Sequence, residues 1–153
     1  MSIAIFDLDG TLCDISHRQH FVRGPRKEQN WKKFFEACVD DVPKWDVIRT
    51  LEALRAAQWH VEIWSGRSDI VQPQTVEWLH NISIPANVPG GVPLTMRPQG
   101  DNIKDSELKA RFLDAFVRKH GQVPTIIFDD RNQVVDMWRA RGITCAQVAP
   151  GDF

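Results

Sequence analysis

The sequence lacks the features of membrane, exported and disulfide-stapled proteins. No apolar run approaches the ~20 residues that a membrane-spanning helix needs, and no basic leader precedes the first apolar segment. The three cysteines are odd in number, far apart and without a CxxC pair, which argues against a disulfide framework or a zinc knuckle. These absences predict a cytoplasmic protein that acts away from membranes in a reducing compartment.

A strong net charge is also missing. The formal net charge is −1, so the overall field gives no reason to expect indiscriminate binding to nucleic acid. Charge is nevertheless uneven, because residues 17–33 carry six Lys or Arg side chains against the single acid Glu28. This basic segment could contact a polyanion, or it could be an ordinary solvated surface.

Short apolar runs alternate with amphipathic segments along most of the chain. Strands are predicted at 2–6, 60–64, 124–128 and 143–148, with a weaker candidate at 92–96. Helices are predicted between them, at 45–57, 73–80, 104–119 and 132–141. The alternation predicts an α/β fold, a Rossmann-like parallel sheet with helices on both faces, which binds ligands at the carboxyl ends of its strands.

One segment interrupts the alternation. Residues 13–42 are too many for a simple strand-to-helix loop, and residues 31–39 within them are amphipathic. We interpret 13–42 as a small helical cap inserted after the first strand. With 153 residues and 42% hydrophobic side chains, the chain is expected to form a single domain, 1–153.

Three predicted strands end in chemically useful groups. Asp7 and Asp9 follow the first, Ser65-Gly66-Arg67 the second, and Asp129-Asp130 the third. Because parallel strands bring their carboxyl ends to one edge, these carboxylates are expected to lie together, which raises their pKa values unless a cation neutralises them. All-oxygen ligands favour Mg²⁺ as that cation.

The spacing of Asp7 and Asp9 suits phosphoryl transfer. If the chain turns just after the strand, one carboxylate can attack phosphorus while the other serves the leaving oxygen. Gly10 permits the tight turn. The alternative is an ordinary turn in which the Asp side chains cap local amides.

The motifs together resemble the haloacid-dehalogenase superfamily. The resemblance lies in FDLDGTL at 6–12, WSGRSD at 64–69, a lysine on a later helix and FDDR at 128–131. It implies Asp7 as the nucleophile that forms an aspartyl-phosphate, and Asp9 as the acid and base. It also implies that Ser65 binds a phosphoryl oxygen, and that Mg²⁺ is held by Asp7, the Asp9 carbonyl and Asp129. Asp130 could contact Mg²⁺ directly, contact it through a water molecule, or only orient Lys109.

Two lysines are candidates for the cation that neutralises the phosphoryl oxygens. Lys104 and Lys109 both lie near the start of the predicted helix. We favour Lys109, because Asp105 lies four residues before it on the same helix face and can hold the ammonium in place. The alternative for this pair is a plain surface ion pair.

A narrower resemblance covers nearly the whole chain. Residues 96–109 and 128–153 are similar to the phosphatase domain family of bacteriophage polynucleotide kinase, which removes 3′-phosphates from nucleic-acid ends. The resemblance implies that Arg18 and Arg67 assist the reaction, that Gly66 lies at the substrate, and that Asp105 and Lys109 act as a pair. No GxxxxGK[ST] motif is present, so kinase activity is not expected of this chain.

Other chemistries fit less well. Cys13 and Arg18 have four residues between them, whereas the loop of tyrosine phosphatases has five, so a cysteine nucleophile is rejected. His17 and His20 lack a third ligand at zinc spacing. Trp31 is a candidate for stacking on a base. Four other tryptophans fall on predicted apolar faces and are expected in the core: Trp45, Trp64, Trp78 and Trp138.

The sequence therefore predicts a Mg²⁺-dependent polynucleotide 3′-phosphatase. It would work in the cytoplasm, that of the host if the protein is phage-encoded, without a membrane or an obligate protein partner. One alternative keeps the chemistry and takes a nucleoside monophosphate as substrate. Another is a non-catalytic module that binds nucleic-acid ends.

Overall fold

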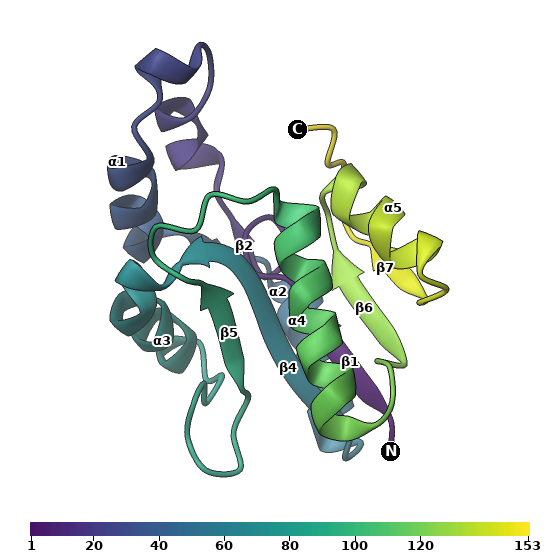
Figure 1. The fold of residues 1–153 in the computed structure, drawn as a ribbon. Helices are drawn as coiled ribbons and strands as arrows, with labels where there is room; N and C mark the ends of the chain where they lie inside the picture. Colours follow the sequence, from purple (N-terminus) through teal and green to yellow (C-terminus); the bar gives the residue numbers. More distant parts are fainter.

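The computed structural model describes residues 1–153, and its centre is a parallel five-stranded sheet (Figure 1). All four neighbouring strand pairs are parallel. The predicted α/β class is therefore confirmed. Across the sheet the strands run in the order β5 (Leu94–Arg97), β4 (His60–Ser68), β1 (Ile3–Phe6), β6 (Ile126–Asp129) and β7 (Cys145–Gln147).

Helices cover both faces of this sheet (Figure 1). Side chains alternate along β1, so that Ile3 and Ile5 enter one apolar cluster while Ala4 and Phe6 enter the other. Burial on both faces explains why the strand reads as an unbroken apolar run. The Phe6 face packs against α2 (Trp45–Ala56) and α3 (Gln72–Asn81), and the Ile5 face against α4 (Asp105–His120) and α5 (Asn132–Ala140).

The insertion after β1 is helical and is closed at its base. A two-stranded antiparallel ladder pairs β2 (Cys13–Asp14) with β3 (Val42–Pro43). Between these strands lie α1 (Trp31–Glu36) and three 3₁₀ turns, at Ser16–Phe21, Arg26–Glu28 and Ala37–Asp40. We call residues 13–42 the cap insertion. Figure 1 shows it at the end of the sheet toward which the strand arrows point.

Local capping and contacts with distant parts of the chain hold the cap insertion in place. The Asn30 side chain accepts a hydrogen bond from the Lys33 amide at 3.0 Å, which starts α1. Phe34 is buried in the core cluster of the Phe6 face. The indole Nε1 of Trp78 on α3 donates to the Asp41 carbonyl at 2.9 Å. The insertion is thus fastened to α3 rather than standing free.

Two sequence predictions are wrong. The strand predicted to end at Trp64 continues to Ser68. Its pairing with β5 shifts register between Ser65 and Ser68, and this irregularity lets the backbone stay extended through Ser65-Gly66-Arg67. Trp45 is 46% exposed, because it is the first residue of α2 and the buried face of this helix begins at Val47. The Arg49 guanidinium stacks on the Trp45 ring. The other three tryptophans expected in the core, Trp64, Trp78 and Trp138, are buried.

None of the helices is both long enough and apolar enough to cross a bilayer.

Replacing Leu51 by Ala tests the packing of α2 on the sheet. Leu51 is fully buried, so Leu51→Ala is expected to lower the free energy of unfolding by about 2–5 kcal/mol. Leu54→Ala is the matched control on the same helix, and because Leu54 is only partly buried it should cost clearly less. Urea unfolding measures both, and equal losses would contradict this packing.

Candidate active site

Three carboxylates meet where β1 and β6 end. Asp7 follows Phe6 directly, Asp129 is the last residue of β6, and Asp130 follows it. Their exposed fractions are 6%, 1% and 3%, and one oxygen from each lies within 4.8 Å of the others. The structure thus brings together three of the four residues predicted to hold a metal. We call Asp7, Asp129 and Asp130 the carboxylate triad.

A lysine from α4 reaches into the carboxylate triad. Lys109 Nζ lies 2.6 Å from Asp7 Oδ1 and 2.9 Å from Asp129 Oδ2, and the side chain is buried. Lys104, the other candidate, is exposed at the residue before α4 begins. One ammonium against three carboxylates leaves a formal excess of two negative charges (3 − 1).

Crowding of carboxylates shifts their proton affinities. Burial raises the pKa of Asp7 well above its usual range, and the Asp129 and Asp130 carboxylates add to this while Lys109 opposes it. Burial and Asp129 raise the pKa of Asp130 to about 6. Because the pKa values of neighbouring carboxylates rise when no cation neutralises them, this crowding is typical of a site for a divalent cation. Carboxylate oxygens are ligands that Mg²⁺ prefers.

The Asp9 carboxylate is not part of the carboxylate triad and binds two arginines instead. Asp9 Oδ1 accepts hydrogen bonds from Arg18 Nη2 at 2.8 Å and from Arg67 Nη2 at 2.5 Å. Asp41 holds the same arginines, accepting from Arg18 Nε at 2.7 Å and from Arg67 Nη2 at 2.9 Å. We call these four residues the Arg–Asp network. Both arginines are almost fully buried, so they hold carboxylates rather than face solvent.

The Arg–Asp network sets the ionisation of Asp9. Burial alone would raise its pKa, but Arg67 and Arg18 outweigh burial and lower the pKa to about 2. Asp9 is therefore ionised at neutral pH in the free protein. Asp41, which sequence reasoning missed, reaches the network from the end of the cap insertion, and no strand end or motif marks it in the sequence.

Cys13 borders the same network. Its Sγ lies 3.3 Å from Asp41 Oδ2 and 3.7 Å from Asp9 Oδ1. Burial raises the pKa of the Cys13 thiol well above its usual value, and both carboxylates act in the same direction. The thiol stays protonated at neutral pH, which supports the rejection of a cysteine nucleophile.

Two glycines make room for carboxylates. Gly10 has a φ of +83°, and a Cβ there would overlap the Asp130 carboxylate. At Gly66 a Cβ would overlap the Asp105 carboxylate, which lies 3.3 Å from Arg97 Nη2 and 3.9 Å from Lys109 Nζ. The glycines thus let the loop after β1 and the end of β4 approach the acidic side chains closely.

Hydroxyl groups complete the inner surface of the site. The Thr11 hydroxyl donates to Asp7 Oδ2 at 3.1 Å. The sequence did not predict this contact, although Thr11 lies in the FDLDGTL motif. Ser65 is 1% exposed, and its Oγ accepts from the Arg67 amide at 3.1 Å. Ser65 therefore lies at the end of β4 beside the arginine that binds Asp9.

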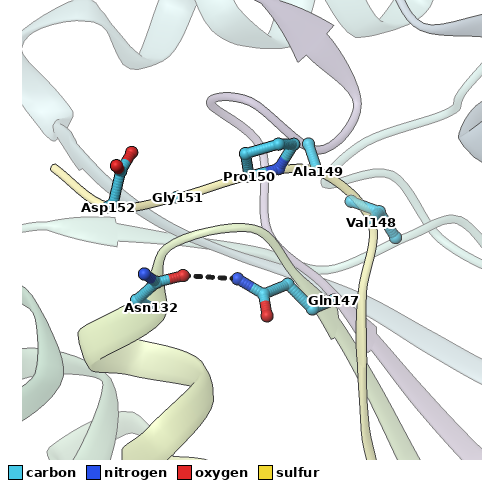
Figure 2. Close-up of a pocket in the computed structure, with 7 residues that line it drawn as sticks. All are labelled: Asn132, Gln147, Val148, Ala149, Pro150, Gly151 and Asp152. Atoms are coloured by element: carbon cyan, nitrogen blue, oxygen red, sulfur yellow. Dashed lines mark hydrogen bonds between the residues drawn. The ribbon is translucent and has the colours of Figure 1, made fainter.

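Two hollows lie near the carboxyl ends of the strands, and residues of the site line the smaller one. The larger, about 540 Å³, is lined by Asn132 and residues 147–152. Two of these side chains are joined, because Gln147 Nε2 donates to Asn132 Oδ1 at 2.6 Å (Figure 2). None of the catalytic candidates lines it. The smaller, about 200 Å³, includes Gly10, Lys44, Asp130 and Phe153, and so opens beside the carboxylate triad.

Comparison with known proteins identifies the family of this chain. The family model of the polynucleotide kinase PNKP phosphatase domain matches residues 1–153. A chain of the Pnkp1/Rnl/Hen1 RNA repair complex is 28% identical, with a TM-score of 0.74, over 99% of this chain and 43% of that chain. This chain therefore spans less than half the length of that relative.

Two more distant structures share the fold. Protein tyrosine kinase A of Mycobacterium tuberculosis matches with 17% identity and a TM-score of 0.60, over 99% of this chain and 87% of that one. A haloacid dehalogenase-like family hydrolase of Streptococcus pneumoniae matches with 14% identity and a TM-score of 0.50, over 96% and 84%. Because the family match spans all 153 residues, this chain belongs to the polynucleotide kinase PNKP phosphatase domain family and is a phosphatase of the haloacid-dehalogenase type.

Proposed function

We propose that this phosphatase is Mg²⁺-dependent and removes 3′-phosphates from nucleic-acid ends through an aspartyl-phosphate on Asp7. The observation that carries the proposal is the buried Lys109 ammonium, which joins Asp7 to Asp129 at 2.6 and 2.9 Å. A nucleophilic carboxylate, a second acid and a fixed cation at one strand edge are what phosphoryl transfer to an aspartate requires.

The carboxylate triad supplies the metal ligands in this proposal. Asp7, Asp129 and the Asp9 carbonyl would hold Mg²⁺, with Asp130 beside them. When bound, Mg²⁺ neutralises the triad and draws charge from a phosphoryl oxygen. The formal excess of two negative charges and the raised pKa values of Asp7 and Asp130 support a divalent cation here.

In the first step an Asp7 carboxylate oxygen attacks phosphorus. The new bond joins Asp7 to phosphorus while the bond to the ester oxygen breaks, and Asp9 donates a proton to the leaving alkoxide. Lys109 and the Ser65 hydroxyl stabilise the charge on the phosphoryl oxygens. The product alcohol leaves, and the phosphoryl group stays on Asp7.

Asp9 needs a proton for that step, although its pKa is about 2 in the free protein. A phosphate dianion near Arg18 and Arg67 competes for their positive charge and repels the Asp9 carboxylate, both of which raise the pKa of Asp9. Substrate binding thus prepares the acid. In the second step Asp9 takes a proton from water, the water oxygen bonds to phosphorus, and the Asp7 carboxylate is released with phosphate.

The cap insertion supports a polynucleotide substrate. The Trp31 side chain is 51% exposed and can stack on a base. Five basic side chains of the insertion are exposed as well: Arg23, Arg26, Lys27, Lys32 and Lys33. The relative in the RNA repair complex supports the same substrate class. The second candidate is a nucleoside monophosphate, which the small 200 Å³ hollow beside Asp130 favours.

Phosphate release in Mg²⁺ tests the function. The substrates are a 3′-phosphorylated oligonucleotide and the 3′- and 5′-mononucleotides. Asp7→Asn is expected to lower turnover at least about 1,000-fold, because no carboxylate remains to attack phosphorus. Asp114→Asn, an exposed carboxylate on α4, is the matched control and should keep wild-type activity.

The outcomes separate the candidates. Preference for the oligonucleotide supports the end-repair reaction. Preference for a mononucleotide would assign a nucleoside monophosphate as the substrate and keep Asp7 as the nucleophile. Wild-type turnover equal to that of Asp7→Asn on every substrate would overturn the catalytic proposal in favour of a module that only binds nucleic-acid ends.

Mg²⁺ binding should weaken in acid because of Asp130. Its pKa is raised to about 6, so the proton competes with Mg²⁺ below that pH and not above about pH 7. Asp130 is expected to contribute up to about tenfold in Mg²⁺ affinity per pH unit below 6. Calorimetric titration between pH 5 and 7.5 measures this. Asp130→Asn should show a shallower pH slope, and equal slopes would exclude Asp130 from the cation site.

Charge reversal on α1 tests the role of the cap insertion. Lys32 and Lys33 are exposed, so the double variant Lys32→Glu, Lys33→Glu should raise KM for the oligonucleotide and leave kcat unchanged. Each lost phosphate contact should reduce the logarithmic salt slope by about one. Hydrolysis of p-nitrophenyl phosphate should not change. Lys119→Glu at the far end of α4 is the matched control, and an equal KM effect there would refute the assignment.

A further inference from the structure

A second group of metal-binding side chains lies at the opposite end of β4 from the active site. His60 and Glu62 begin β4, and His120 is the last residue of α4. His60 Nε2 lies 2.8 Å from Glu62 Oε1, and His120 Nε2 lies 3.9 Å from the same oxygen. One ligand atom from each residue lies within 4.8 Å of the others. We call these three residues the His–Glu–His cluster.

Sheet and helix geometry bring the cluster together. The period of two along β4 places His60, Glu62 and Trp64 on one face, the face on which α4 packs. Phe116 on α4 contacts both Trp64 and His120. Its ring centroid lies 5.6 Å from that of Trp64 and 4.2 Å from that of the stacked His120 ring. This packing aims the His120 imidazole at the start of β4.

The cluster combines a buried carboxylate with a buried imidazole nitrogen that has no hydrogen-bond partner. Glu62 is 7% exposed, and its ion-pair partners are the two histidines, with neither Lys nor Arg among them. His120 Nε2 is buried and has no hydrogen-bond partner. A buried carboxylate and an orphaned imidazole nitrogen both cost free energy. A cation that binds both atoms would remove both costs.

We propose that His60, Glu62 and His120 bind a divalent transition metal, Zn²⁺ by donor chemistry. Two imidazole nitrogens and one carboxylate suit Zn²⁺, whereas Mg²⁺ prefers oxygen ligands alone. The observed separations of 2.8 and 3.9 Å bracket the ~3.3 Å between neighbouring ligands of tetrahedral zinc. The partly exposed side chains of His60 and His120 leave room for water as a fourth ligand.

A contact behind the ligands orients the carboxylate. Trp64 Nε1 donates to Glu62 Oε2 at 2.9 Å, so Oε1 is left to face the histidines. Hydrogen bonds of this kind to a ligating group are typical of metal sites and fix its direction. Trp64 and Phe116 belong to an apolar cluster, so hydrophobic side chains cover the inner side of this arrangement.

The metal would join β4 to α4 at a distance from the active site, and so act as a structural clamp between these two elements. His60 and Ser65 are five residues apart on β4, roughly 16 Å along an extended strand. Bound Zn²⁺ would join the carboxyl end of α4 to the start of β4. The opposite ends of the same two elements carry Lys109 and Arg67. The clamp therefore stabilises the pair of elements that position both side chains.

Zn²⁺ titration of the untagged full chain, with Mg²⁺ in excess to occupy the carboxylate triad, tests the proposal. Calorimetry is expected to find one Zn²⁺ per chain that Mg²⁺ does not displace. A hundredfold excess of free Zn²⁺ over its Kd should raise Tm by about 5 °C or more. His120→Gln and His60→Gln should each weaken Zn²⁺ binding at least about 100-fold.

His80→Gln is the matched control. His80 lies on α3 outside the cluster, so this variant should bind Zn²⁺ as the wild type does. The Tm of each variant without Zn²⁺ reports folding, and the second histidine variant serves if one does not fold. Wild-type protein without a Zn²⁺ site in excess Mg²⁺, or equal Zn²⁺ affinity in all four proteins, would overturn the proposal.

Discussion

The buried ammonium of Lys109 is the contact on which the arrangement of the site depends. It lies between Asp7 at the end of β1 and Asp129 at the end of β6, and so offsets part of the cost of burying both carboxylates. α4 must cross the sheet at one position for its first turns to deliver Lys109 there. The remaining negative charge is what makes a divalent cation the natural complement of the carboxylate triad.

A second charged group joins the cap insertion to the sheet. Arg18 and Asp41 come from the insertion, Arg67 from β4 and Asp9 from the loop after β1. Any movement of the insertion therefore changes the contacts of Asp9. The same contacts lower the pKa of Asp9, so the Arg–Asp network links the position of the insertion to the ionisation of the proposed acid. In the proposed mechanism, this network would connect substrate recognition with proton transfer.

β4 and α4 each carry a group of candidate functional side chains at both ends. The carboxyl end of β4 and the first turns of α4 deliver Arg67 and Lys109, whereas their other ends bring Glu62 and His120 together. The apolar contact between Trp64 and Phe116 lies between the two sites. Packing in the middle of this pair therefore constrains the geometry at both ends, because a rigid helix transmits a tilt at one end to the other.

The sequence by itself determined the strands of the main sheet, the helices that cover it and the proposed catalytic acids. Apolar periodicity predicted the parallel sheet, and Asp7 and Asp129 were found because both follow apolar strands. The four-residue spacing of Asp105 and Lys109 favoured the lysine that the structure places between the carboxylates. These signals are local, since a strand end or a helix face is encoded within a few residues.

Tertiary structure alone decided the rest. Asp41 joins Arg67 across 26 residues, and nothing near Asp41 in the sequence marks that contact. The continuation of β4 to Ser68 depends on a register shift against β5, and the exposure of Trp45 depends on where α2 meets the sheet. His120 meets Glu62 only because α4 packs over β4. Contacts of this kind arise from packing between distant segments, which no local pattern of residues encodes.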